Sequence, residues 1–80
     1  MEPRLLDRIE VNPKVMVGKP VIKGTRIPVE LILRMLSQGI SEEEILEEYP
    51  HLTKEDIQAA LAYAAEALAV EEVLPLAQSK

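Results

Sequence analysis

Four cationic side chains lie within thirteen residues in the first half of the chain, where they could contact an anionic ligand. They are Lys14, Lys19, Lys23 and Arg26. The residues around them favour short β-strands, and a β-ribbon can enter a nucleic-acid groove while such cations bind phosphates. Two alternatives stay open: lysines on short exposed strands also prevent edge-to-edge aggregation, and Arg26 could pair with a nearby acid such as Glu30.

A second candidate for nucleic-acid contact is the start of the last predicted helix. Two helices meet at residues 50–52, a connection short enough for a helix-turn-helix motif. The second helix of such a motif presents its N-terminal residues to the bases, so Gln58 could bind adenine and Lys54 a phosphate. Glu55 and Asp56 belong to the same turn and would repel a polyanion. A three-helix bundle that only resembles the motif is the alternative.

Residues suited to catalysis or metal binding are scarce. The chain has one histidine, His51, in a predicted turn, and it has no cysteine. The serines lack a Gly-x-Ser-x-Gly context. Glu43 and Glu47 lie one helical turn apart, but neighbouring glutamates make a solvated face the simpler interpretation. We therefore expect no enzymatic activity, no catalytic residue, no metal site and no cofactor.

The net charge of −5 conceals a division between the two halves of the chain. Residues 1–40 carry seven lysines and arginines against four acids, a net charge of +3, whereas residues 41–80 carry two lysines against ten acids, a net charge of −8. This division suits anions at one end and a basic partner at the other. Solubility and matching of helix dipoles account for much of the acid equally well.

The elements that must position these residues begin with short strands. Residues 8–11 alternate charged and apolar side chains, as a half-buried strand does. Residues 21–22 and 25–27 favour strands on either side of Lys23-Gly24, which has the length of a two-residue hairpin loop. Residues 1–7 are expected to be loose. Because so small a sheet is unstable alone, it must lie against helices or pair with a second copy.

Three helices are predicted to follow, at about 28–38, 42–48 and 53–73. Gly39 closes the first helix, and Ser41 with Glu44 forms a capping box that opens the second. Thr53 caps the third helix. The third helix is expected to bury Ile57, Ala60, Leu61, Ala64 and Leu68. Its other faces are rich in alanine, which suits close helix packing but also raises helix propensity.

The segments 18–32, 49–53 and 56–61 carry a resemblance to a known family. Over roughly residues 8–66 the chain resembles the DUF433 family, whose members are small bacterial and archaeal proteins described as antitoxin-like, with a helix-turn-helix region. Such proteins are commonly paired with PIN-like ribonuclease toxins. The resemblance implies an antitoxin that binds a PIN-like ribonuclease and can bind operator DNA.

The negative charge of the second half suggests where such a protein partner would bind. Carboxylates of the acidic half could occupy ribonuclease sites meant for phosphates. The candidate contact residues are Glu71, Glu72, Val73 and Leu74. The alternative is that this segment is only the frayed end of a helix and binds no partner. Two alternatives to the antitoxin stay open: a dimeric DNA-binding regulator that acts alone, and a dimeric adaptor that binds no DNA.

The predicted fold is mainly α with a small β segment, and it forms one domain over residues 1–80. The β segment covers about 8–27, a three-helix, helix-turn-helix-like bundle covers about 28–74, and residues 75–80 form a tail. A monomer of 80 residues has a marginal core, so we expect a homodimer, with exchange of the N-terminal strands. No apolar run is long enough to span a bilayer, and the N-terminus lacks a signal-peptide core. We therefore expect a cytoplasmic protein that binds no membrane.

Overall fold

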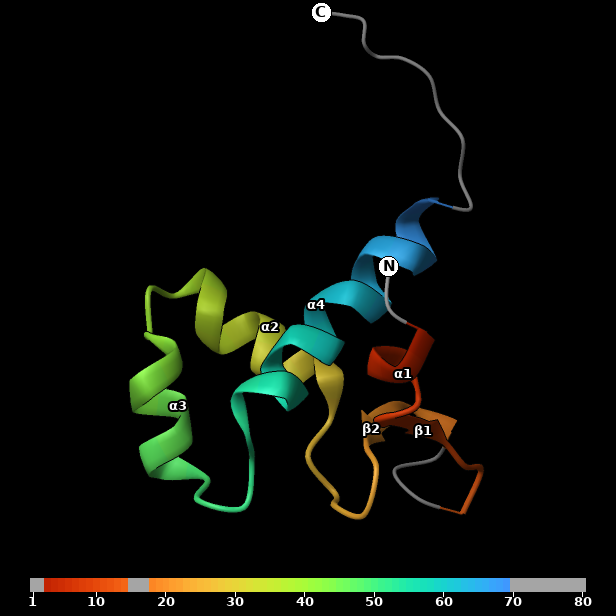
Figure 1. Cartoon of the computed structure of the whole chain (residues 1–80), viewed down its shortest axis with the longest axis horizontal. Helices are drawn as coiled ribbons and strands as arrows, with labels where there is room; N and C mark the ends of the chain where they lie inside the picture. Colours follow the sequence, from red (N-terminus) through yellow and green to blue (C-terminus); the bar gives the residue numbers. More distant parts are fainter. Residues whose placement is uncertain (1–2, 15–17, 70–80) are drawn as a thin grey trace, which may run out of the picture.

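The computed structural model describes residues 3–14 and 18–69. Over these ranges a two-stranded antiparallel sheet is followed by three longer helices, which confirms the predicted fold class (Figure 1). In chain order the elements are α1 (Pro3–Leu6), β1 (Ile9–Val11), β2 (Pro20–Ile22), α2 (Val29–Ser37), α3 (Glu42–Glu48) and α4 (Lys54–Ala69). None of the helices within these ranges is long and apolar enough to cross a membrane.

The sheet pairs other segments than the predicted hairpin, which joined residues 21–22 to residues 25–27. β1 pairs with β2, with Ile9 opposite Ile22 and Val11 opposite Pro20. The predicted turn at Lys23-Gly24 is present: the Thr25 N–H donates to the Ile22 carbonyl (2.9 Å), and Gly24 has φ +81°. Glycine adopts this positive φ without the steric cost of a side chain.

The predicted strand at residues 25–27 is wrong. The Thr25 hydroxyl donates to the Ile22 carbonyl (2.7 Å) and accepts from the Ile27 N–H (2.9 Å). These two bonds hold residues 25–27 close to the turn, so they do not form an extended strand. Beyond the turn, the Ile22 N–H donates to the Ile27 carbonyl (2.9 Å), and Val21 forms a single bridge with Pro28. The bridge extends no further because helix α2 begins at the next residue, Val29.

The end of α2 and the start of α3 have the caps that were predicted. α2 ends in a Schellman motif, in which the Ile40 N–H donates to the Met35 carbonyl (3.1 Å) and the Gly39 N–H donates to the Leu36 carbonyl (3.0 Å). Gly39 has φ +86° there, as a C′ glycine does. α3 opens with the complete capping box of Ser41 and Glu44. Both features satisfy backbone groups that a helix end leaves without partners.

The core is aliphatic and lies where the sheet meets α2, α3 and α4. Its cluster of buried residues consists of Ile22, Val29, Ile32, Ile45, Leu52, Ile57 and Ala60. Residues 3–6 form the short helix α1, which packs against α4 and was not predicted.

Two of the residues predicted to be buried in α4 are exposed. Ile57 and Ala60 are buried, but Leu61 is 45% exposed and Leu68 is 72% exposed. Leu68 belongs to the C-terminal part of α4, which extends past the body of the molecule in Figure 1. Leu61 directly follows the buried Ala59 and Ala60, so it is exposed because it faces away from the core. Residues 70–73 of the predicted helix lie outside the described residues.

Candidate macromolecule-binding surfaces

Three connecting segments lie along one edge of the molecule, at the lower side of Figure 1. They are residues 12–14 after β1, residues 23–28 between β2 and α2, and residues 50–53 between α3 and α4. We call these residues the loop edge. Lys14, Lys23, Arg26 and His51 belong to these segments.

All six residues predicted to contact nucleic acid are exposed, but they do not form one patch. They are Lys14, Lys19, Lys23, Arg26, Lys54 and Gln58. Lys14 follows β1 and Lys19 precedes β2, so both lie at one end of the sheet, whereas Lys23 and Arg26 follow β2 at the other end. Lys54 and Gln58 lie in the first turns of α4.

Lys19 is engaged in an ion pair, and the partner of Glu30 differs from the predicted one. Glu30 accepts hydrogen bonds from Lys19 (3.2 Å) and from Arg34 (2.7 Å), not from Arg26. The hydrogen bond from Lys19, followed by the one from Arg34, lowers the pKa of Glu30 below its ordinary value of 4.5. Lys19 is therefore partly neutralised, whereas Arg26 takes part in none of the ion pairs between described residues.

Two open depressions meet at Gly24, and each contains charges of both signs. The first has a volume of about 620 Å³ and is lined by Leu5, Asp7, Arg8, Lys23, Gly24, Glu55 and Asp56. The second has a volume of about 600 Å³ and is lined by Glu10, Gly24, Thr25, Arg26, Ile27 and His51. His51 thus lies across a shared depression from Arg26, a proximity that the sequence does not reveal.

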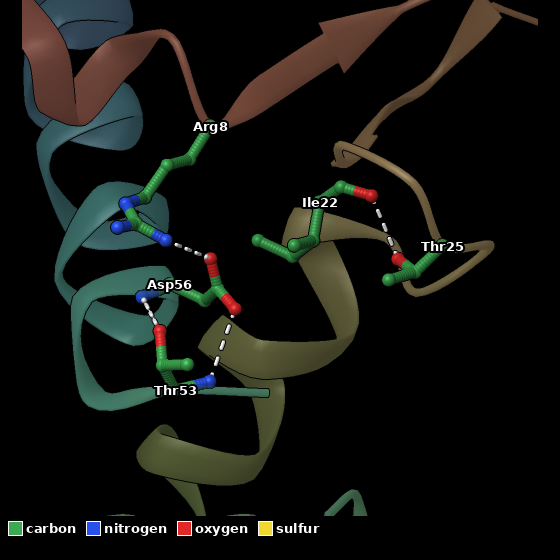
Figure 2. Close-up of polar contacts among 5 residues, drawn as sticks. All are labelled: Arg8, Ile22, Thr25, Thr53 and Asp56. Carbon is green, nitrogen blue, oxygen red and sulfur yellow. Dashed lines mark hydrogen bonds and ion pairs between the residues drawn. The ribbon is translucent and has the colours of Figure 1, made fainter. Parts of the chain in front are cut away.

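The first turn of α4 holds a buried carboxylate, and this corrects the prediction that Asp56 would face a polyanion. Asp56 is only 7% exposed. Its Oδ1 accepts from Arg8 (3.0 Å) and its Oδ2 from the Thr53 N–H (3.0 Å), while the Thr53 hydroxyl accepts from the Asp56 N–H (3.2 Å), as Figure 2 shows. Thr53 and Asp56 thus cap α4 reciprocally. The spacing Thr-x-x-Asp signals this cap in the sequence, but nothing in the sequence identifies Arg8 as the third member.

The opposite charge gathers on α3. We call Glu43, Glu44, Glu47 and Glu48 the acidic face of α3; all four are exposed, and none is in an ion pair with a described residue. Glu44 accepts from the Ser41 N–H (2.9 Å) as part of the capping box. Glu44 and Glu48 also border an apolar depression of about 310 Å³, whose other lining residues are Met35, Ile40, Ile45 and Tyr49.

The predicted protein-contact site falls in a part of the chain that the structure does not describe. Glu71, Glu72, Val73 and Leu74, the predicted protein contacts, lie outside the described residues.

Within residues 3–14 and 18–69, no group of three or more histidine, cysteine, aspartate or glutamate side chains is arranged to hold a metal ion.

Comparison with known proteins relates the chain to a family and to a solved structure. The sequence pattern of the family described as "Protein of unknown function (DUF433)" matches residues 9–64. A crystal structure of a DUF433 member from Anabaena variabilis superposes with a TM-score of 0.71 at 32% identity, covering 82% of this chain and 76% of that one.

Two relatives are similar over shorter segments. The chain is 40% identical over 53 residues to the uncharacterized protein y4eO of Sinorhizobium fredii; the match covers 66% of this chain but only 24% of the length of y4eO. It is 63% identical over 30 residues to an uncharacterized protein of Archaeoglobus fulgidus, covering 38% of this chain and 83% of the archaeal one. From the matched range and the shared fold, we conclude that this chain belongs to the DUF433 family.

Proposed function

We propose that this protein is an antitoxin-like protein that binds a PIN-like ribonuclease through the acidic face of α3. The observation that carries the proposal is the apolar depression bordered by Glu44 and Glu48. Lysine and arginine side chains have an aliphatic stem and a cationic head, so this combination of an apolar lining and a carboxylate border suits them. Lysine and arginine are the side chains that neutralise the phosphates of a nucleic acid, so a ribonuclease commonly presents them where it binds RNA.

The distribution of charge supports the same partner. Among described residues, those before residue 41 carry seven lysines and arginines against three acids, whereas residues 41–69 carry one lysine against eight acids. The acidic face therefore belongs to a strongly negative half of the chain. Long-range attraction would steer a basic protein toward α3 and accelerate its association.

Operator DNA is the second candidate ligand, and the position of Asp56 favours it. Because Asp56 is buried against Arg8 and Thr53, only one acid, Glu55, is exposed beside Lys54 and Gln58 in the first turns of α4. The cations Lys23 and Arg26 of the loop edge add positive charge on the neighbouring segment. This arrangement is less repulsive to phosphates than the sequence alone implies.

Growth measurements test the proposal in cells. The chain is co-expressed with the product of each gene that flanks its own, and growth and co-purification are recorded. We expect one flanking product to be a PIN-like ribonuclease that arrests growth alone and is silenced in complex with this chain. Growth arrest that persists when both proteins are expressed, or the lack of any complex with either product, would contradict the proposal.

A further inference from the structure

The outer edge of β1 carries backbone groups that β2 does not use. The Lys23 N–H donates to the Arg8 carbonyl (2.7 Å), and Ile9 lies opposite Ile22. In an antiparallel ladder, hydrogen-bonded pairs alternate with pairs that are not hydrogen-bonded. Glu10 is therefore hydrogen-bonded to Val21, whereas the N–H and C=O groups of Ile9 and Val11 point away from β2.

The bonds of β2 confirm this alternation and show that its own outer edge is occupied. The Ile22 N–H donates to the Ile27 carbonyl (2.9 Å), and the Ile22 carbonyl accepts from the Thr25 N–H (2.9 Å), both on the side away from β1. Val21 and Pro28 form a bridge on that same side. Within residues 3–14 and 18–69, β1 is thus the strand whose outer edge has no backbone partner.

We infer that this edge pairs, in antiparallel orientation, with β1 of a second copy of the chain. An edge with outward N–H and C=O groups is recognised by another extended backbone. Val11 is 54% exposed, one of the three exposed large apolar residues among those described, so the edge also offers apolar area. A two-fold axis presents the same groups from both copies, which makes such an edge complementary to itself.

The neighbours of Val11 select one register. Centring the pair on Glu10 would place two carboxylates directly opposite each other, which destabilises a sheet. Centring it on Ile9 would require residues 7–8 to be extended, but the Arg8 N–H is bonded to the Leu5 carbonyl (3.1 Å). The remaining register places Val11 opposite Val11 of the second copy.

In this register the flanking side chains are also complementary. Glu10 lies opposite Asn12 of the second copy. The Asn12 side-chain oxygen already accepts from the Lys14 N–H (2.8 Å), so its amide N–H groups can donate to the Glu10 carboxylate. The turn at Pro13 and Lys14 ends the ladder directly after Asn12. The result is one four-stranded sheet shared by two chains, a more stable unit than an isolated pair of strands.

This inference is independent of the proposed function, because the β1 edge is not part of the acidic face of α3. It is tested on the full chain by light scattering across a concentration series and by amide hydrogen exchange followed by NMR. We expect the mass of two chains at high concentration, with slow exchange at Val11 and Glu10. On dilution to the mass of one chain, the Val11 amide should become fast while the Glu10 amide, bonded to Val21, stays slow.

Two variants separate this edge from other contacts. Val11→Pro removes the outward N–H without touching the ladder to β2, so it should give a single-chain mass with the Glu10 amide still slow. Asn12→Asp keeps the oxygen that accepts from Lys14 but places a carboxylate opposite Glu10, and it should raise the dimer dissociation constant about tenfold. If Val11→Pro fails to fold, the dissociation constant of Asn12→Asp still tests the inference.

Three results would overturn the inference. The first is a single-chain mass at every concentration, whatever the exchange rate at Val11. The second is a dimer that persists in folded Val11→Pro, which would indicate another interface such as the exposed face of α4 with Leu61 and Leu68. The third is a dimer whose dissociation constant is unchanged in Asn12→Asp.

Discussion

The Arg8 guanidinium donates a hydrogen bond of 3.0 Å to Oδ1 of Asp56, a residue 48 positions away in the chain. This contact joins the residue that precedes β1 to the first turn of α4. The second carboxylate oxygen of Asp56 accepts from the Thr53 N–H, so both oxygens are used (Figure 2). The contact thereby holds the N-terminus of α4 against the sheet, beside the Lys23-Gly24 turn of the loop edge.

We predict that Asp56→Ala lowers the free energy of unfolding by about 2 kcal/mol. The variant removes the Asp56 half of the reciprocal cap, a loss of about 1 kcal/mol, and it leaves Arg8 without its carboxylate partner, whereas the Thr53 hydroxyl can still accept from the N–H of residue 56. The Arg8 side chain is 43% exposed and can be rehydrated, which limits the second contribution. Urea unfolding measures the change. Glu55→Ala, at the exposed neighbouring position, is the control and should change stability by less than about 0.5 kcal/mol; equal losses in both variants would contradict the role of the contact.

The Glu30 ion pairs should make stability depend on pH in the acidic range. The pKa of Glu30 is lowered by its hydrogen bonds to Lys19 and Arg34, so folding favours the carboxylate form. The stabilisation is fully present above the ordinary pKa of 4.5 and is lost as pH falls through the lower pKa of the folded state. Glu30→Gln should therefore be less stable than wild type at neutral pH, and the difference should shrink below pH 4.5.

Urea unfolding at a series of pH values checks this dependence. Glu66→Gln is a matched control, because Glu66 is exposed and takes part in none of the ion pairs between described residues. A stability difference between wild type and Glu30→Gln that stays constant from neutral to acidic pH would rule out the ion pairs as its source.

Local signals allowed much of the fold to be predicted from the sequence. The bounds of α3 follow from Ser41, Glu44 and Pro50, because caps and proline act through neighbouring residues. Contacts between distant segments could not be predicted in this way. The partner of Arg8 depends on where α4 packs, and the exposure of Leu61 and Leu68 depends on which parts of α4 contact the rest of the molecule, which helical periodicity does not encode.

The candidate surfaces show the same difference. The exposure of Lys23 follows from its position in the predicted Lys23-Gly24 turn, whereas Arg26, which is also exposed, was predicted in a strand. The neutralisation of Lys19 was not, because it depends on the position of Glu30 on α2. The apolar depression beside the acidic face of α3 combines residues of α2, of α3 and of the segments on both sides of α3, so the sequence showed its glutamates but not the depression itself.

We predict that DNA binding depends on the loop edge. The double variant Lys23→Ala/Arg26→Ala should weaken binding to duplex DNA from upstream of the gene by on the order of tenfold and reduce the slope of log affinity against log salt by about 2. A gel-shift titration at several salt concentrations measures both. Lys19→Ala/Arg34→Ala is the matched control, because it removes the same charge from cations that are paired with Glu30. An equal loss in both double variants would show that DNA binding depends on net charge alone, which would contradict the prediction.

The acidic face of α3 should govern association with the ribonuclease. Glu47→Gln/Glu48→Gln should weaken the complex by on the order of tenfold, mainly at low ionic strength, because exposed charges are screened by salt. Surface plasmon resonance with the immobilised ribonuclease measures the change. Glu55→Gln/Glu66→Gln removes the same charge from exposed positions on α4 and should have little effect. If this control weakens the complex as much, the location of the carboxylates does not matter.

The most direct measurement is a titration of the purified chain into the flanking-gene ribonuclease while RNA cleavage is followed. Our proposal predicts that cleavage stops at a fixed molar ratio of the two proteins, and that Glu47→Gln/Glu48→Gln shifts the titration to higher concentration. Cleavage that continues unchanged in an excess of the chain would contradict the proposal.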